Sequence, residues 1–443
     1  MRRMIADAPW PVVLLVASFL APTELSLYLG GLRLPPHRVA LLVLILPALW
    51  RLARGRDGLR VRAFDVLFAG YAAWTIGVFM HHQGQSEGLQ FGGSLALESL
   101  GGYLVARVWI RDVATYRASM RLLVGAIAAA GLIALPEAVL GIHYVHDILR
   151  ELTGYHHPIG HETRLGLTRA YGTFDHPIHL GTFCASVAAL VWFNEPRLKE
   201  ARRKVGIIAA ATFMGLSSAP LLCFFLQVAF VGWDKLTRGV KGRFALTLVA
   251  VALLYAGLSL VMTRSPFMIV ATGMVLDSWT GYYRMVIWEW GLINVWANPL
   301  AGLGLGDWER PWWMISASVD AFWLVITMRA GIPAFLLLVA AIVTMSVAVN
   351  RAGKRAPLAE MRQAALAWSM ALIALSLVAC TVHFWNVLHA YFFFFLGLAG
   401  WLADAQRVQA GRSSDRAHAT GVADGRARRV GYWADPPEGL AAR

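Results

Sequence analysis

A polar segment at residues 282–320 gathers a cation, aromatic rings, glycines and a carboxylate between two hydrophobic stretches. Residues 283–296 have the composition of a helix, so Arg284 and Trp288, four residues apart, would share one face. Asp320 closes the segment. Its carboxylate can take a proton from a hydroxyl group, or it can cap the helix expected to follow. This combination of residue types indicates a functional site.

The same segment is rich in tryptophan and glycine. Tryptophans form a belt at membrane–water interfaces, but aromatic faces also stack on sugar rings, and Trp288 is a candidate for substrate contact. Gly302, Gly304 and Gly306 resemble a nucleotide-binding pattern, yet they neither follow a strand nor open a βαβ unit. We expect them to form a flexible turn that approaches a substrate. Seven of the 18 tryptophans lie in or next to this segment: Trp279, Trp288, Trp290, Trp296, Trp308, Trp312 and Trp313.

A second polar segment, residues 169–177, runs directly into another apolar stretch. It places Arg169 and His176 at the boundary between water and lipid, on either side of a glycine turn. Asp175 as a helix cap and Pro177 in the first turn would explain the segment as a plain helix start. A site containing Arg169 and His176 explains it equally well, so both interpretations stay open.

Seven of the 13 histidines lie within residues 142–179. His156, His157 and His161 have a spacing that suits metal ligands if the stretch is helical. A proline and a glycine interrupt such a helix, and no cysteine is close in sequence. We therefore expect solvated surface histidines and no bound metal.

Composition defines the class of protein. Of the 443 residues, 58% are hydrophobic and 15% charged, and the mean hydropathy is +0.56. A soluble domain is nearer a quarter charged. Apolar stretches of the ~17–25 residues needed to cross a ~30 Å hydrocarbon core recur along the chain. The sequence therefore predicts an all-α, polytopic integral membrane protein.

We predict about 12 transmembrane helices within residues 1–404 and two long periplasmic loops, at about residues 142–177 and 263–319. A basic loop follows each even-numbered span up to the tenth, which places both termini in the cytoplasm. This distribution accounts for the net charge of +14 without nucleic-acid binding. Residues 405–443 are polar and basic and are predicted to be a disordered cytoplasmic tail. The predicted spans are residues 10–29, 38–52, 63–80, 91–109, 120–141, 178–194, 205–219, 221–233, 244–262, 320–348, 363–383 and 387–403.

Four motifs follow one another along the chain. They are Arg169-x-x-Gly172-x-Phe174-x-His176-Pro177, Arg284-x-x-x-Trp288, Asn298-Pro299-Leu300-x-Gly302-x-Gly304, and Asp320-x-x-Trp323-Leu324 with Gly331. Together they resemble the O-antigen ligase and polymerase superfamily, which includes Wzy-type repeat-unit polymerases. The resemblance covers roughly residues 165–400, and the predicted topology agrees with that of the family.

The resemblance implies a glycosyltransferase of the bacterial inner (cytoplasmic) membrane. Members of the family take a glycan from undecaprenyl pyrophosphate at the periplasmic face and transfer it to a sugar hydroxyl, generally without cofactor or metal. The implied partners are the lipid-linked oligosaccharide, membrane lipids and a chain-length regulator. A pyrophosphate leaving group needs cations, and arginine contacts phosphate through two parallel hydrogen bonds. Arg284 is the first candidate for this role and Arg169 the second.

The chain departs from the family pattern at two places. The family often has Ser-Arg-Gly after the seventh span, where this chain has residues 217–219, Ser-Ser-Ala. Arg164 and Arg310 are the candidate replacements for the missing arginine. The ligases carry a histidine near the start of the tenth span, where this chain has Asp320. The difference favours a polymerase and leaves the catalytic base open between Asp320 and His176.

Two alternatives to a polymerase remain: a ligase that transfers finished glycan to a lipid acceptor, and a lipid-glycan transporter or flippase. A flippase is expected to line a central cavity with many charges inside the membrane. In this chain the candidate charges cluster in two external loops.

Overall fold

The computed structural model describes residues 7–155, 158–262, 278–314 and 316–404. Over these ranges the chain is mostly helical, which confirms the predicted class. Strands in the described part form two short antiparallel hairpins: β1 (Leu27–Leu29) with β2 (Leu32–Leu34), and β3 (Thr163–Arg164) with β4 (Leu167–Thr168). The predicted tail at residues 405–443 lies outside the described residues.

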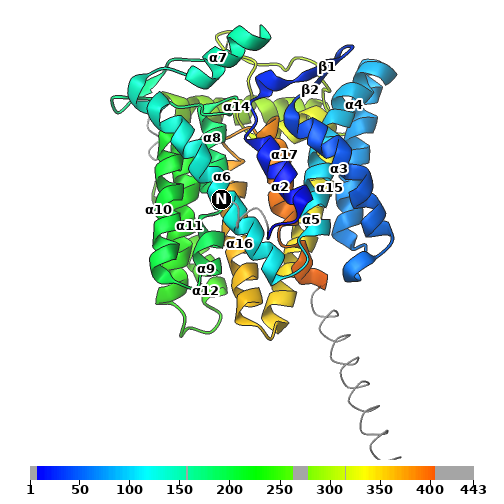
Figure 1. Ribbon diagram of the computed structural model, residues 1–443. Helices are drawn as coiled ribbons and strands as arrows, with labels where there is room; N and C mark the ends of the chain where they lie inside the picture. The colour runs from blue at the N-terminus through cyan, green and yellow to red at the C-terminus, as the bar shows by residue number, and fades with distance from the viewer. Residues whose placement is uncertain (1–6, 156–157, 263–277, 315, 405–443) are drawn as a thin grey trace, which may run out of the picture.

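Figure 1 shows the helices as a bundle, with α7, α14 and the β1–β2 hairpin gathered at one end. Most connections between helices are short, as is usual for helices packed side by side. The helices are α2 (Trp10–Phe19), α3 (Pro36–Ala53), α4 (Ala63–Ala96), α5 (Gly102–Trp109), α6 (Val113–Leu140), α7 (Tyr144–Thr153), α8 (Pro177–Ala185), α9 (Ala188–Asn194), α10 (Leu198–Met214), α11 (Ser218–Leu236), α12 (Arg243–Val261), α14 (Ser278–Ala297), α15 (Phe322–Arg355), α16 (Ala359–Val378) and α17 (Val387–Gly397), with short helical turns η1 (Thr23–Leu25), η2 (Arg56–Gly58) and η3 (Leu97–Gly101).

Eight helical segments in the described part of the chain are long and apolar enough to cross a membrane. A helix forms its backbone hydrogen bonds within its own segment, as the hydrocarbon core of a bilayer requires, and its apolar side chains can face the lipid. The protein is therefore membrane-embedded, although these eight segments do not by themselves establish the predicted 12 spans. The segments are Pro36–Ala53, Ala63–Trp109, Val113–Leu140, Pro177–Asn194, Ser218–Leu236, Phe322–Arg355, Ala359–Val378 and Val387–Asp404.

The predicted spans 63–80 and 91–109 belong to one helical segment of 47 residues. The polar stretch between them, which the sequence places in a loop, is itself helical except at Gly84, where φ is 78°. Glycine adopts this left-handed conformation without steric cost. A Cβ on Gly88 would overlap the backbone of Met80, so the chain turns back on itself and its two arms pack in close contact.

Both predicted long loops contain regular structure. The first contains α7 and the β3–β4 hairpin, and the second contains α14. The short spans predicted at 205–219 and 221–233 are the longer helices α10 and α11. Basic residues in the first turns of α10 hide its true start, because they interrupt the apolar pattern.

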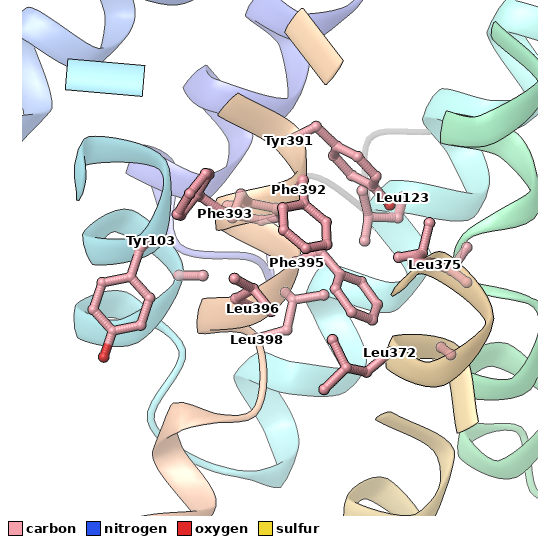
Figure 2. Packing of buried hydrophobic residues seen from close by; sticks show 14 of the residues in the cluster. Tyr103, Leu123, Leu372, Leu375, Tyr391, Phe392, Phe393, Phe395, Leu396 and Leu398 are labelled. Carbon is pink, nitrogen blue, oxygen red and sulfur yellow. The ribbon is translucent and has the colours of Figure 1, made fainter. Parts of the chain in front are cut away.

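Helix α17 lies at the centre of the apolar core, and its residues are buried on every side. A helix that is hydrophobic all round belongs in such a position. Figure 2 shows its phenylalanine rings packed among side chains from α5, α6 and α16, namely Tyr103, Leu123, Leu372 and Leu375. This core fixes the segment at residues 380–389, which lies next to the site described below.

Helix α15 is broken near its start, and the glycine-rich loop fills the break. Gly331 has φ 78° and ψ 170°, which are not helical values. The loop supplies hydrogen bonds to backbone groups that the break releases. Arg329 adds hydrogen bonds from its guanidinium to the carbonyls of Gly304 and Gly306. The backbone pairs are Leu303 N–H to Met328 O (2.7 Å), Gly304 N–H to Arg329 O (3.0 Å) and Ile332 N–H to Pro299 O (2.8 Å).

Replacing Gly331 by alanine is expected to destabilise the protein. A Cβ there would overlap the carbonyl oxygen of Leu300, and the left-handed backbone alone costs an L-residue about 1–2 kcal/mol. Thermal unfolding in detergent should show a clearly lower midpoint for Gly331→Ala. The matched control is Gly77→Ala in α4, where a Cβ would meet nothing within 4 Å. Equal midpoints for the two variants would contradict this account of the break.

Candidate active site

A pocket of about 240 Å³ brings together side chains from four separate parts of the sequence. It includes five of the seven residues that the sequence singled out as site candidates. Residues between 162 and 320 meet here because α8, α11, α14 and the start of α15 converge on one place. We call it the arginine pocket; its lining residues are Glu162, Arg164, Arg169, His176, Ile178, Ser217, Ser218, Ala219, Arg284 and Asp320.

The β3–β4 hairpin delivers two of the arginines. Its two-residue turn, Leu165-Gly166, has φ values of 55° and 76°, as a tight hairpin turn requires. Arg169, just after β4, is buried and donates hydrogen bonds to Glu162 Oε2 (2.6 Å) and Ser217 Oγ (2.7 Å). Arg164 donates to the carbonyl of Leu216 (3.2 Å). The hairpin is thus tied to the α10–α11 connection.

A buried carboxylate holds the turn that follows Arg169. Glu137 of α6 is fully buried, and its Oε2 accepts the backbone N–H groups of Tyr171 (3.0 Å) and Gly172 (2.8 Å). Gly172 has φ 61°, a value that favours glycine. This role could not be predicted, because Glu137 lies in an apolar span 32 residues before Arg169.

His176, and not Asp175, caps helix α8. The His176 Nδ1 accepts the backbone N–H of Ile178 (3.1 Å), with Pro177 in the first turn. Asp175 instead accepts hydrogen bonds from Thr23 and from Asn386 Nδ2. Because Nδ1 accepts, a neutral His176 ring carries its proton on Nε2. In this geometry Nε2 is a hydrogen-bond donor.

The amino terminus of α11 opens onto the pocket through Ser217, Ser218 and Ala219. The first turn of an α-helix has N–H groups without acceptors in the helix, and its dipole favours an anion there. The side chain of its N-cap residue, Ser217, makes no capping hydrogen bond. Arg164 lines the same pocket as this helix terminus.

Arg284 reaches the pocket from α14, which packs across α15. Gly291 allows the close approach, since a Cβ there would lie 2.6 Å from a methyl group of Leu324. The Arg284 Nε is buried and has no hydrogen-bond partner among the described residues. Burial lowers the pKa of Arg284, and the positive charges of Arg164 and Arg169 lower it further, while Asp320 opposes them. A charged group with these surroundings is suited to an anionic ligand.

Asp320 is free of the capping role that the sequence left open. Helix α15 begins at Phe322, its N-cap is Ala321, and no side chain caps it. The Asp320 carboxylate is partly buried and accepts a hydrogen bond from Ser318 Oγ (2.9 Å). Its place in the pocket leaves it available to a substrate hydroxyl.

The other two candidates lie elsewhere. The Trp288 Nε1 donates to the carbonyl of Cys380 (2.8 Å), and the ring packs in the apolar cluster between α14 and α15. Arg310 pairs with Asp307 at 2.6 Å and donates to the carbonyl of Met314 (3.1 Å). Neither side chain lines the arginine pocket. Of the candidate metal ligands, His156 and His157 lie outside the described residues.

The pocket carries three arginines against two carboxylates. Burial would raise the pKa of Glu162, but the hydrogen bond and charge of Arg169, helped by Arg164 and His176, hold it below its usual 4.5. The Glu162–Arg169 pair is therefore fully charged at neutral pH. Its stabilising effect is lost only as the pH falls through the lowered pKa. Glu162, which was not among the predicted site residues, competes with any anion for the two arginines.

Glu162→Gln is expected to tighten the binding of inorganic pyrophosphate about twofold to fivefold. The side chain is 59% exposed, and exposed ion pairs contribute about 0.2–1 kcal/mol, so releasing Arg169 and Arg164 has an effect of that size. Isothermal titration of the purified protein measures it. Glu151→Gln, an exposed acid on α7, is the control and should bind as the parent does. Weaker binding by Glu162→Gln would contradict the prediction.

No family model matches this chain, and no curated protein matches it either.

Proposed function

We propose that the protein is a membrane glycosyltransferase that polymerises glycan repeat units carried on undecaprenyl pyrophosphate. One observation carries the proposal: Arg164, Arg169 and Arg284 converge with Asp320 on one pocket at the amino terminus of α11. Arg169, Arg284 and Asp320 come from separate motifs of the resemblance to the O-antigen ligase and polymerase superfamily, and Arg164 is one of the two candidate replacements for the arginine that the chain lacks. Cations and a carboxylate in one pocket suit transfer from a pyrophosphate to a hydroxyl group.

The roles follow from the chemistry of that transfer. The acceptor hydroxyl attacks the anomeric carbon, a carbon–oxygen bond forms, and the bond from that carbon to the pyrophosphate oxygen breaks. Asp320 takes the hydroxyl proton. Arg284 and the α11 terminus stabilise the charge that builds on the leaving pyrophosphate. His176, a donor at Nε2 in this geometry, hydrogen-bonds the same anion.

The proposal also fixes an orientation. Basic loops alternate along the chain, so we place both termini in the cytoplasm and the arginine pocket at the periplasmic face of a bacterial inner membrane. We reach 12 spans by counting the two arms of the hairpin at Gly84 separately and by adding α2, α10 and α12 to the other seven long apolar segments. A chain-length regulator is the expected protein partner.

Deletion of the gene distinguishes a polymerase from a ligase. Loss of a polymerase leaves single repeat units attached to the final acceptor, because a separate ligase still transfers them. Loss of a ligase leaves long polymer on the lipid carrier and none on the acceptor. We expect the first result when surface glycans and lipid-linked glycans are separated by length. A deletion strain with normal glycans in both fractions would overturn both functions.

A further inference from the structure

A second pocket, of about 140 Å³, shares no lining residue with the arginine pocket. It lies between α4, the start of α15 and the segment leading into α17. We call it the histidine pocket. Several lining residues, including Arg329 and His383, are partly exposed. The residues that matter to the argument are Arg38, Glu98, Phe322, His383, Trp385 and His389.

The histidine pocket contains buried polar atoms that lack partners. Glu98 is fully buried, and its Oε1 accepts from Arg38 Nε (2.7 Å) and interacts with His37 Nε2 (3.0 Å). Within the described ranges, Glu98 Oε2, His383 Nδ1 and His389 Nε2 have no hydrogen-bond partner. Each such group costs about 1–3 kcal/mol when it stays unpaired. A ligand that bonds any of these atoms relieves part of that cost.

The charges of the pocket select a neutral ligand. Glu98 disfavours an anion, while Arg38 and Arg329 disfavour a cation. The walls include the Phe322 and Trp385 rings, and a few polar groups among apolar walls are typical of small-molecule sites. A hydroxyl group both donates and accepts, so it can satisfy a carboxylate oxygen and an imidazole nitrogen alike. This chemistry fits a sugar ring.

The volume and position of the pocket also fit one sugar. Since a water molecule takes about 30 Å³ of liquid, 140 Å³ is the space of four or five waters, roughly one ring. The Trp385 ring is 5.8 Å from the His176 ring of the arginine pocket. Phe322 follows Asp320 by two residues, a span of at most about 7 Å. The two pockets are therefore neighbours on either side of this wall.

We propose that the histidine pocket binds one sugar ring of the acceptor glycan and presents that glycan to Asp320. The assignment rests on the proposed function. It makes His383 and His389 specificity residues for the acceptor, acting separately from the arginines that bind the donor's pyrophosphate. Donor and acceptor thus meet at the wall formed by His176 and Trp385.

Steady-state kinetics with separate substrates tests the proposal. The donor is the lipid-linked repeat unit, and the acceptor is the oligosaccharide released from it by mild acid. In His383→Phe and His389→Phe we expect the acceptor KM to rise about tenfold or more, with the donor KM unchanged. His81→Phe, an exposed histidine on α4, is the control and should match the parent. An unchanged acceptor KM in both pocket variants, or a rise in donor KM alone, overturns the proposal.

Hydrogen exchange provides a readout that does not need turnover. In the full chain in nanodiscs, the released oligosaccharide should slow exchange at residues 322–330 and 380–389, and inorganic pyrophosphate should slow it at residues 215–221. Retained pyrophosphate protection also shows that a pocket variant is folded. If pyrophosphate protects but the oligosaccharide does not, the acceptor assignment fails alone. If pyrophosphate does not protect, the proposed function fails, and the acceptor assignment fails with it.

Discussion

Arg284→Ala is expected to lower the rate of glycosyl transfer about 10²–10³-fold, the usual cost of losing one donor to a developing anion. Its buried Nε has no partner among the described residues, so the side chain is available to the pyrophosphate. Cells that carry the variant should accumulate lipid-linked single repeat units, while the amount of protein in the membrane stays normal. Gel analysis of glycan length measures the effect.

Two further variants make this result specific. Arg284→Lys keeps the charge but loses the planar pair of donors, so we expect partial activity. Arg310→Ala removes an arginine that pairs with Asp307 outside the pocket, and it should leave chain length normal. Normal chain length in Arg284→Ala would contradict the role given to Arg284.

Asp320→Asn is expected to slow transfer about 10²–10⁴-fold, the range that a positioned general base contributes. The amide keeps the size of the side chain and its contact with Ser318, but it cannot take the hydroxyl proton. Initial rates with purified protein and lipid-linked repeat units measure the loss. Asp307→Asn is the matched control, because Asp307 is an exposed carboxylate of the same loop outside the pocket.

His176→Asn separates the two candidate bases. Asparagine retains an acceptor for the Ile178 N–H, as a helix cap should, and it removes the imidazole. If Asp320 is the base, His176→Asn should lose about tenfold or less, the contribution of a single hydrogen bond. A near-complete loss in His176→Asn with normal turnover in Asp320→Asn would reverse the assignment. Normal turnover in both would exclude both as the base.

The sequence predicted the helical membrane class well because that class depends on composition. Each apolar stretch long enough to cross a bilayer can be recognised from its own residues, without knowledge of its contacts. Residue types and a resemblance to a family pattern also singled out seven candidate site residues: Arg164, Arg169, His176, Arg284, Trp288, Arg310 and Asp320. The pocket brings together five of them, all except Trp288 and Arg310. Local residue types were therefore enough to predict many of the residues that line the candidate site.

The sequence could not predict contacts that depend on packing between distant elements. Glu137 supports the turn after Arg169 from inside an apolar helix, and Glu162 pairs with that arginine across a hairpin. The contact of the glycine-rich loop with the break in α15 could not be predicted, because Gly331 lies 25 residues beyond Gly306. Arg310 has the positive charge expected of a phosphate-binding residue, but it forms an ion pair with Asp307, three residues earlier in the chain.

The most direct measurement gives the purified protein only lipid-linked repeat units in nanodiscs. The account predicts a ladder of glycans that differ by one repeat, with one undecaprenyl pyrophosphate released for each bond formed. The ladder should be absent with Arg284→Ala. Repeat units that stay unchanged, in the presence of folded protein that binds inorganic pyrophosphate, would contradict the account.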